Sequence, residues 1–224
     1  MGYAYLQLGV HDAAERASRT ALVEAERLGA VSLQATAKLN VGIAVALQGR
    51  LAEGAALAEE VLALARDHGD RRLESFGRIY LGRIALLGGE LERAARESLR
   101  VVEEPAALPS LRALGFAVLS AAQLVQGSPL DALETARQAM AILTSLGEVE
   151  EGEALIRVTH VEALAATGDA AGAQTAVRAA RDLLLAQAAK IADLELRRSY
   201  LSAVPENARI LALASELVGD GVSG

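Results

Sequence analysis

Five glycines recur along the chain at a nearly constant interval, and this period constrains the fold more than any other feature of the sequence. The intervals are 40, 40, 38 and 41 residues, between Gly9, Gly49, Gly89, Gly127 and Gly168. Glycine is favoured where a helix ends in a tight turn, because it has no β-carbon to clash when the backbone becomes left-handed. A fixed period of this length indicates a repeat architecture in which each unit is one supersecondary element.

The residues that follow each glycine predict a pair of closely packed helices. Five residues after each glycine stands a small residue, in the order Ala14, Gly54, Ala94, Ala132 and Ala173. A small or apolar residue follows one helical turn later, at Ser18, Ala58, Ser98, Ala136 and Val177, and the next apolar position is Ala21, Val61, Val101, Ala139 and Ala180. These positions share one helical face. We therefore expect added volume at Gly89 or Ala94 to disrupt packing.

Composition agrees with an all-α fold. Hydrophobic residues make up 52% of the chain but aromatic residues only 3%, so the apolar content comes mainly from Ala, Leu and Val. Four prolines in 224 residues leave long windows for helices. Without cysteine, the chain has no disulfide, thiolate metal site or cysteine nucleophile.

Charge and hydropathy argue against two functions, binding to a polyanionic partner and spanning a membrane. A net charge of -7 argues against nucleic acid or anionic lipid as the main partner. Mean hydropathy is +0.27, but charged residues interrupt every window before the roughly 20 apolar residues that a membrane span needs. The start of the sequence shows no secretion signal, so we expect a cytoplasmic protein.

The spacing resembles that of the tetratricopeptide repeat. Leu81-Gly82, Gly89, Ala94 and Val101 follow the family's order of apolar-Gly, turn Gly, Ala and apolar residue, and Tyr5 matches its aromatic position. The resemblance covers residues 1–187. The period is nearer 40 than the usual 34, the terminal proline of each repeat is missing, and Val161 replaces a glycine. Stretched repeats of this kind are similar to those C-terminal to large bacterial signal-transduction ATPases and kinases.

This resemblance implies a right-handed superhelical solenoid of about five antiparallel helical hairpins. Their expected ranges are 2–28, 30–68, 70–104, 107–146 and 148–187. Residues 188–218 resemble the closing segment of those signalling proteins and are expected to form capping helices, followed by a flexible tail at 219–224. Because the first hairpin begins almost at its glycine, we expect the chain to be a fragment of a longer protein, the alternative being a short first helix.

The sequence offers little chemistry. His11, His68 and His160 lie in different repeats with no second ligand at metal spacing, so we expect no metal, cofactor or catalytic residue. His11 and His68 are expected in solvated turns and His160 as a packed or rim residue. The acidic run of Glu148, Glu150, Glu151 and Glu153 is interpreted as the water-facing start of a helix. Surface solvation is the simplest interpretation of Arg71-Arg72 and Arg197-Arg198, although the first pair could clamp a partner's carboxylate or phosphate.

The expected function is a non-catalytic protein-protein interaction scaffold in signalling. In the tetratricopeptide family the first helix of each hairpin lines a concave groove for a partner segment. Carried over by register, the groove residues are Tyr3, Leu6, Leu39, Ile43, Phe76, Ile79, Arg83, Leu86, Leu124 and Glu162. Arg83 would be exposed there and would anchor an acidic partner segment, so that Arg83→Glu would weaken binding and leave the fold intact.

The partner would be another protein, a peptide or upstream domains of the same polypeptide, and the oligomeric state is left open. The alternative is a ligand-sensing domain that binds a small molecule within the superhelix. A closed pocket with convergent polar groups would favour sensing, and an open apolar groove would favour docking.

Overall fold

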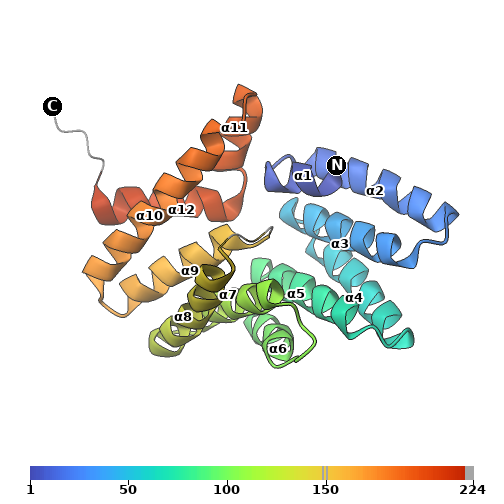
Figure 1. The fold of residues 1–224 in the computed structure, drawn as a ribbon, viewed down its shortest axis with the longest axis horizontal. Helices are drawn as coiled ribbons and strands as arrows, with labels where there is room; N and C mark the ends of the chain where they lie inside the picture. The colour runs from blue at the N-terminus through green and yellow to red at the C-terminus, as the bar shows by residue number, and fades with distance from the viewer. Residues whose placement is uncertain (148, 150, 220–224) are drawn as a thin grey trace.

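The computed structural model describes residues 1–147, 149 and 151–219, and within them the chain forms twelve helices and no strand (Figure 1). The all-helical prediction is therefore confirmed for this part of the chain. The helices are α1 (Gly2–Gln7), α2 (His11–Arg27), α3 (Val31–Leu47), α4 (Leu51–Asp67), α5 (Arg71–Leu87), α6 (Leu91–Val102), α7 (Pro109–Val125), α8 (Pro129–Leu146), α9 (Glu153–Ala166), α10 (Ala170–Ala189), α11 (Leu194–Ser202) and α12 (Pro205–Val218).

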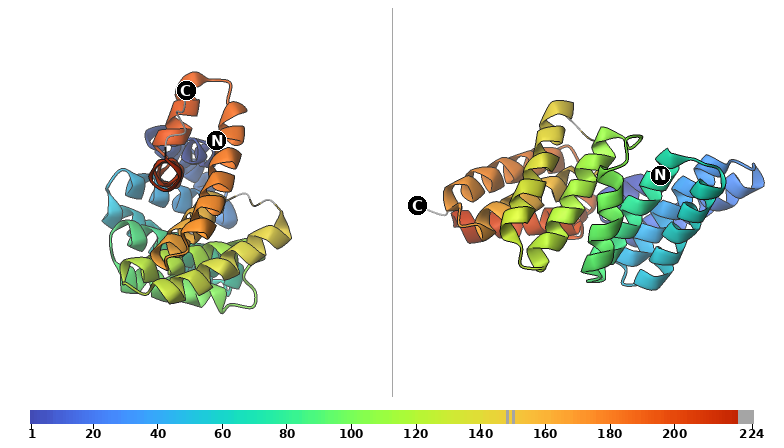
Figure 2. Two further views of the ribbon diagram at one scale, coloured as in Figure 1. Left: turned by 90° about the vertical axis from the view of Figure 1, so that its left-hand side faces the viewer. Right: turned by 90° about the horizontal axis from the view of Figure 1, so that it is seen from below.

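The helices pack in chain order as adjacent antiparallel pairs. Each helix from α1 to α10 contacts the next one along the chain, and the leading helices α3, α5, α7 and α9 also contact one another in that order. The helix α12 packs against α9 and α10 and so continues the row of leading helices. Figure 2 shows the pairs stacked side by side with their axes inclined to one another. This arrangement is consistent with a helical repeat.

The turn glycines lie where the repeat pattern predicts. All five stand between the two helices of a pair, with φ between +74° and +87°. A side chain is disfavoured at such angles, which explains the period of the glycines. At Gly89 an added β-carbon would meet no atom within 4 Å. The expected lack of space is therefore wrong at Gly89, where the backbone angle alone requires glycine.

Close approach between helices occurs five residues later, as predicted. A β-carbon on Gly54 would lie 2.5 Å from the carbonyl oxygen of Gly42, which faces it on α3. The four alanines at this register, Ala14, Ala94, Ala132 and Ala173, are fully buried. The apolar position of the first unit, Ala21, is exposed instead of buried. Because α1 has only six residues, it does not extend along the second half of α2, where Ala21 lies.

The two ends of the described array meet. A β-carbon on Gly9, between α1 and α2, would lie 3.0 Å from Ala203 Cβ and 3.0 Å from the carbonyl oxygen of Ser199. In Figure 1 the row of helix pairs curves round until α1 faces α11. The side chain of Asn207 on α12 is buried and donates a hydrogen bond to the carbonyl of Tyr200, which ties α12 to α11. Within the described residues, none of the helices combines the length and apolar character needed to cross a membrane.

Candidate functional site

An apolar groove crosses the leading helices of the second, third and fourth pairs. Its volume is about 690 Å³, and most of its lining comes from α3, α5 and α7 and the turn before α7. The apolar residues that line it include Leu39 of α3, Leu73 and Phe76 of α5, and Leu111 and Leu114 of α7. Such a row of apolar side chains from successive repeats can accept an extended or helical segment.

One cation stands at the edge of this apolar groove. Arg72, at the start of α5, lines the groove and is exposed, and it makes no ion pair or hydrogen bond with any of the described residues. Its neighbour Arg71 differs, because it turns away and pairs with Glu104 Oε2 at 2.6 Å. Of the two arginines that the sequence analysis considered as a clamp, only Arg72 therefore faces the groove.

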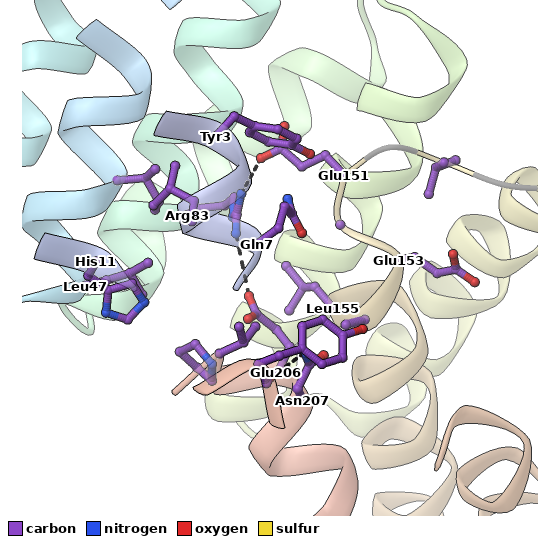
Figure 3. A pocket seen from close by; sticks show the side chains of 18 of the residues that line it. Tyr3, Gln7, His11, Leu47, Arg83, Glu151, Glu153, Leu155, Glu206 and Asn207 are labelled. Atoms are coloured by element: carbon purple, nitrogen blue, oxygen red, sulfur yellow. Dashed lines mark hydrogen bonds and ion pairs between the residues drawn. The ribbon is translucent and has the colours of Figure 1, made fainter. Parts of the chain in front are cut away.

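A second, polar pocket lies beside the apolar groove, where the first and last helices approach the middle of the array (Figure 3). Its volume is about 170 Å³. Tyr3 and Glu151 line both the polar pocket and the apolar groove and so stand between them. Arg83 lies at the centre, reached by Glu151 from the segment before α9 and by Glu206 from the start of α12.

Arg83 is held by two carboxylates and is not exposed as expected. Its Nη1 lies 2.6 Å from Glu151 Oε1, and its Nη2 lies 3.6 Å from Glu206 Oε1. Its side chain is only 17% exposed. The hydroxyl of Tyr80 donates to Glu151 Oε2 at 3.2 Å, and the Arg83 guanidinium lies 6.0 Å from the centre of the Tyr80 ring. The prediction of an exposed Arg83 is thus wrong, because Glu151 and Glu206 reach it from distant parts of the chain.

Burial and nearby charges both shift the pKa values of Arg83 and Tyr80. Burial opposes the charge of Arg83, but the Glu151 and Glu206 carboxylates outweigh it and raise the pKa of Arg83 above its usual value. Burial raises the pKa of Tyr80 well above its usual value, and the charge of Glu151 acts in the same direction. Tyr80 therefore stays a neutral hydrogen-bond donor, and Arg83 stays charged.

Glycine at the start of α9 sets the position of Glu151. Gly152 has φ of +84°, and a β-carbon there would lie 2.5 Å from Leu114 Cδ1. The chain therefore passes tightly over α7 before α9 begins at Glu153. Glu151 precedes the helix and points at Arg83, so its predicted water-facing position is wrong. Glu153 is in the first helical turn and pairs with Arg157 at 2.7 Å, whereas Glu148 and Glu150 lie outside the described residues.

The polar pocket also contains His11, which the sequence analysis placed in a solvated turn. His11 is the first residue of α2 and is half-buried, and its Nε2 atom is buried without a hydrogen-bond partner among the described residues. Burial lowers the pKa of His11, and the nearby Asp12 and Glu206 carboxylates oppose that effect without reversing it. The imidazole is therefore neutral at pH 7, and its Nε2 atom has almost no exposed surface.

The predicted groove residues divide between several environments. Leu39 and Phe76 line the apolar groove, Leu6, Ile43 and Arg83 line the polar pocket, and Tyr3 lines both. Ile79 is fully buried in the main core cluster, and Leu86 packs against that cluster. Leu124 packs against a second, smaller cluster that includes Ala132 and Leu164. Glu162 accepts a hydrogen bond from Arg209 of α12 at 2.7 Å. The structure therefore brings together about half of the predicted set, in two adjoining sites.

The other polar residues singled out in the sequence have structural positions. His68 is exposed at the end of α4, as expected, and His160 is half-buried within α9, where burial, followed by the charge of Arg137, lowers its pKa. Arg197 donates to the carbonyl of Ile191 at 2.7 Å, whereas Arg198 is exposed. Within residues 1–147, 149 and 151–219, no group of three or more His, Cys, Asp or Glu side chains could hold a metal ion.

Several residues that line the two sites were not predicted from the sequence. Glu206 was treated only as part of the closing segment, and Glu151 only as a helix-start charge, because nothing in their local spacing points to Arg83. The groove residues of α7 were missed because the register was carried over from the glycine positions. Pro109, which starts α7 with an apolar face at Leu111 and Leu114, was the available signal.

Neither a scan against models of protein families nor a search of curated proteins finds a match for this chain. The observed sequential helix pairs are consistent with a helical repeat, and no family is identified. The resemblance to tetratricopeptide repeats therefore rests on the residue spacing alone.

Proposed function

We propose that this chain is a non-catalytic scaffold that binds a segment of a partner protein, or of upstream domains of its own polypeptide, in the apolar groove. The observation that carries this proposal is the apolar groove of about 690 Å³ across α3, α5 and α7. Contiguous apolar grooves with a polar edge commonly receive apolar side chains from another protein.

The lining indicates what kind of segment would fit. Phe76 and its apolar neighbours provide anchor points for apolar side chains, and Arg72 at the edge favours an acidic residue beside them. Arg72 thus takes the role that the sequence analysis gave to Arg83. The expected partner segment combines two or more apolar residues with an aspartate or glutamate.

The finer description of the fold belongs to the same proposal. The period and the residue order support a long tetratricopeptide-type solenoid with a right-handed superhelix, as found in bacterial signalling proteins. In this interpretation α11 and α12 close its C-terminal face, and the burial of Ile210, Leu213 and Ala214 supports that role.

Selection from a displayed random-peptide library tests the docking function directly. The selected peptides should share apolar anchors next to an acidic residue, and Phe76→Ser should weaken their binding about 30-fold or more. The matched control is Phe116→Ser, because Phe116 is the chain's other phenylalanine, is also half-buried and does not line the groove. Peptides that bind wild type and Phe76→Ser equally would contradict the proposal.

Sensing of a small molecule, the alternative function, would use the polar pocket instead. The convergence of Arg83, Glu151, Glu206 and His11 on one small volume favours this second candidate. It differs from docking in its site and in its ligand.

A further inference from the structure

We propose that the polar pocket binds a small primary amine, as its ammonium ion, with a short apolar chain. This inference concerns a different site from the apolar groove and does not rest on the docking function. The charges around Arg83 are the first observation that supports it.

The polar pocket has more negative than positive charge. One guanidinium, that of Arg83, faces the two carboxylates of Glu151 and Glu206. Glu153, the remaining acidic residue of the lining, is already paired with Arg157 on its own helix. The centre of the pocket therefore has one net negative charge among the described residues, and its three charged side chains are 17–20% exposed. Net charge at such a site is costly unless a cation compensates it.

Two polar groups of the polar pocket have no hydrogen-bond partner among the residues that the structure describes. The Arg83–Glu206 contact of 3.6 Å is longer than a hydrogen bond, and Glu206 accepts no hydrogen bond from any other described residue. His11 Nε2 is likewise buried without a partner. An ammonium group has three N–H donors and no acceptor, so it can donate to Glu206. A carboxylate ligand would instead have to displace the carboxylates that Arg83 already holds.

Part of the lining of the polar pocket is apolar. Leu6 of α1 and Ile43 and Leu47 of α3 line it, and Figure 3 shows Leu47 beside His11. A cavity of about 150 Å³ can hold benzene, which has about six non-hydrogen atoms, so the polar pocket of about 170 Å³ suits a ligand of that size. A primary amine with a chain of about four carbons satisfies the size, the charge and the apolar wall.

Calorimetric titration of the full chain with n-butylammonium chloride at pH 7.5 tests this assignment, with 1-butanol and sodium butyrate as neutral and anionic analogues. We expect saturable one-site binding of n-butylammonium and a higher melting midpoint in its presence. Butanol and butyrate should bind at least about tenfold more weakly, because neither supplies the missing positive charge.

Two variants locate the site. Glu206→Gln should weaken n-butylammonium binding about 30-fold, whereas Glu216→Gln, a matched change on the exposed face of the same helix, should leave it unchanged. His11→Lys places an ammonium beside Glu206 and should abolish binding while far-ultraviolet circular dichroism stays that of the wild type.

The pH dependence of n-butylammonium binding provides a further test. The charged groups that face His11 are Asp12 on α2 and Glu206 on α12, and Arg83, Glu151 and Glu153 complete the charges of the pocket. Protonation of His11 adds a positive charge beside Glu206. Binding should therefore weaken as the pH is lowered below the usual pKa of histidine. The pH profiles of the wild type and of the control Glu216→Gln should coincide.

Several results would overturn the proposal. These are no saturation with n-butylammonium, equal or tighter binding of butyrate or butanol, or unchanged affinity in a folded Glu206→Gln variant. The Phe76→Ser variant separates this inference from docking, because it should lose peptide binding and keep amine binding.

Discussion

Removing the charge of Arg83 tests whether the ion cluster stabilises the fold. Arg83→Met keeps most of the aliphatic stem but leaves Glu151, among the described residues, with only the Tyr80 hydroxyl as a donor. Breaking a fully buried ion pair costs about 3–5 kcal/mol, and breaking an exposed one costs about 0–1 kcal/mol. The Arg83 and Glu151 side chains are 17% and 19% exposed, so we expect a loss of about 2–3 kcal/mol.

The assay is thermal unfolding followed by circular dichroism. For a chain of this size, about 2–4 °C of melting midpoint corresponds to each kcal/mol, so the midpoint should fall by about 4–12 °C. The matched control is Arg71→Met, because Arg71 is 67% exposed and its loss should cost at most about 1 kcal/mol. A double-mutant cycle with Glu151→Gln should show coupling of about 1 kcal/mol or more. Equal midpoints for Arg83→Met and Arg71→Met would refute the reasoning.

Three further changes test the packing, the charges and the closing segment. Gly54→Val should lower the free energy of unfolding by about 2–3 kcal/mol, because its side chain would meet the backbone of α3. Ala52→Val, at an exposed position of the same helix, should lower it by less than about 1 kcal/mol in the same melting assay. Hydrogen bonds from Arg50 lower the pKa of Glu15 from 4.5 to about 2. The stability that this carboxylate contributes is therefore present above pH 4.5 and is lost as the pH falls towards 2. Glu15→Gln should flatten that part of an acid-unfolding curve. Asn207→Ala should lower the free energy of unfolding in urea by about 1–3 kcal/mol, because it removes the buried side chain that donates to the carbonyl of Tyr200.

Local features of the fold could be predicted from the sequence because they depend on single residues. The turn at Gly89 needs a left-handed backbone, and the contact at Gly54 needs a missing β-carbon, and both requirements recur at a fixed period. The helical class follows from the same pattern together with the scarcity of proline. These inferences need no knowledge of how distant parts of the chain meet.

The candidate sites could be predicted only in part, because they depend on such distant meetings. Arg83 was placed correctly on a leading helix, but its partners Glu151 and Glu206 lie 68 and 123 residues further along the chain. The curvature that brings them together is a sum of small rotations at each pair, and no single residue encodes it. His11 was misjudged for the same reason, because the surface that buries it includes α12.

The contact between Gly9 and α11 has a consequence for folding kinetics. Most contacts in this chain join neighbouring helices, and such local contacts form quickly. The approach of Gly9 to Ser199 and Ala203 instead joins segments separated by nearly the whole described chain. The entropic cost of closing this long loop is offset only after the intervening helix pairs have formed and the array has curved. The helix pairs should therefore assemble first, and the ends should meet in a later step that variants of the intervening pairs would slow.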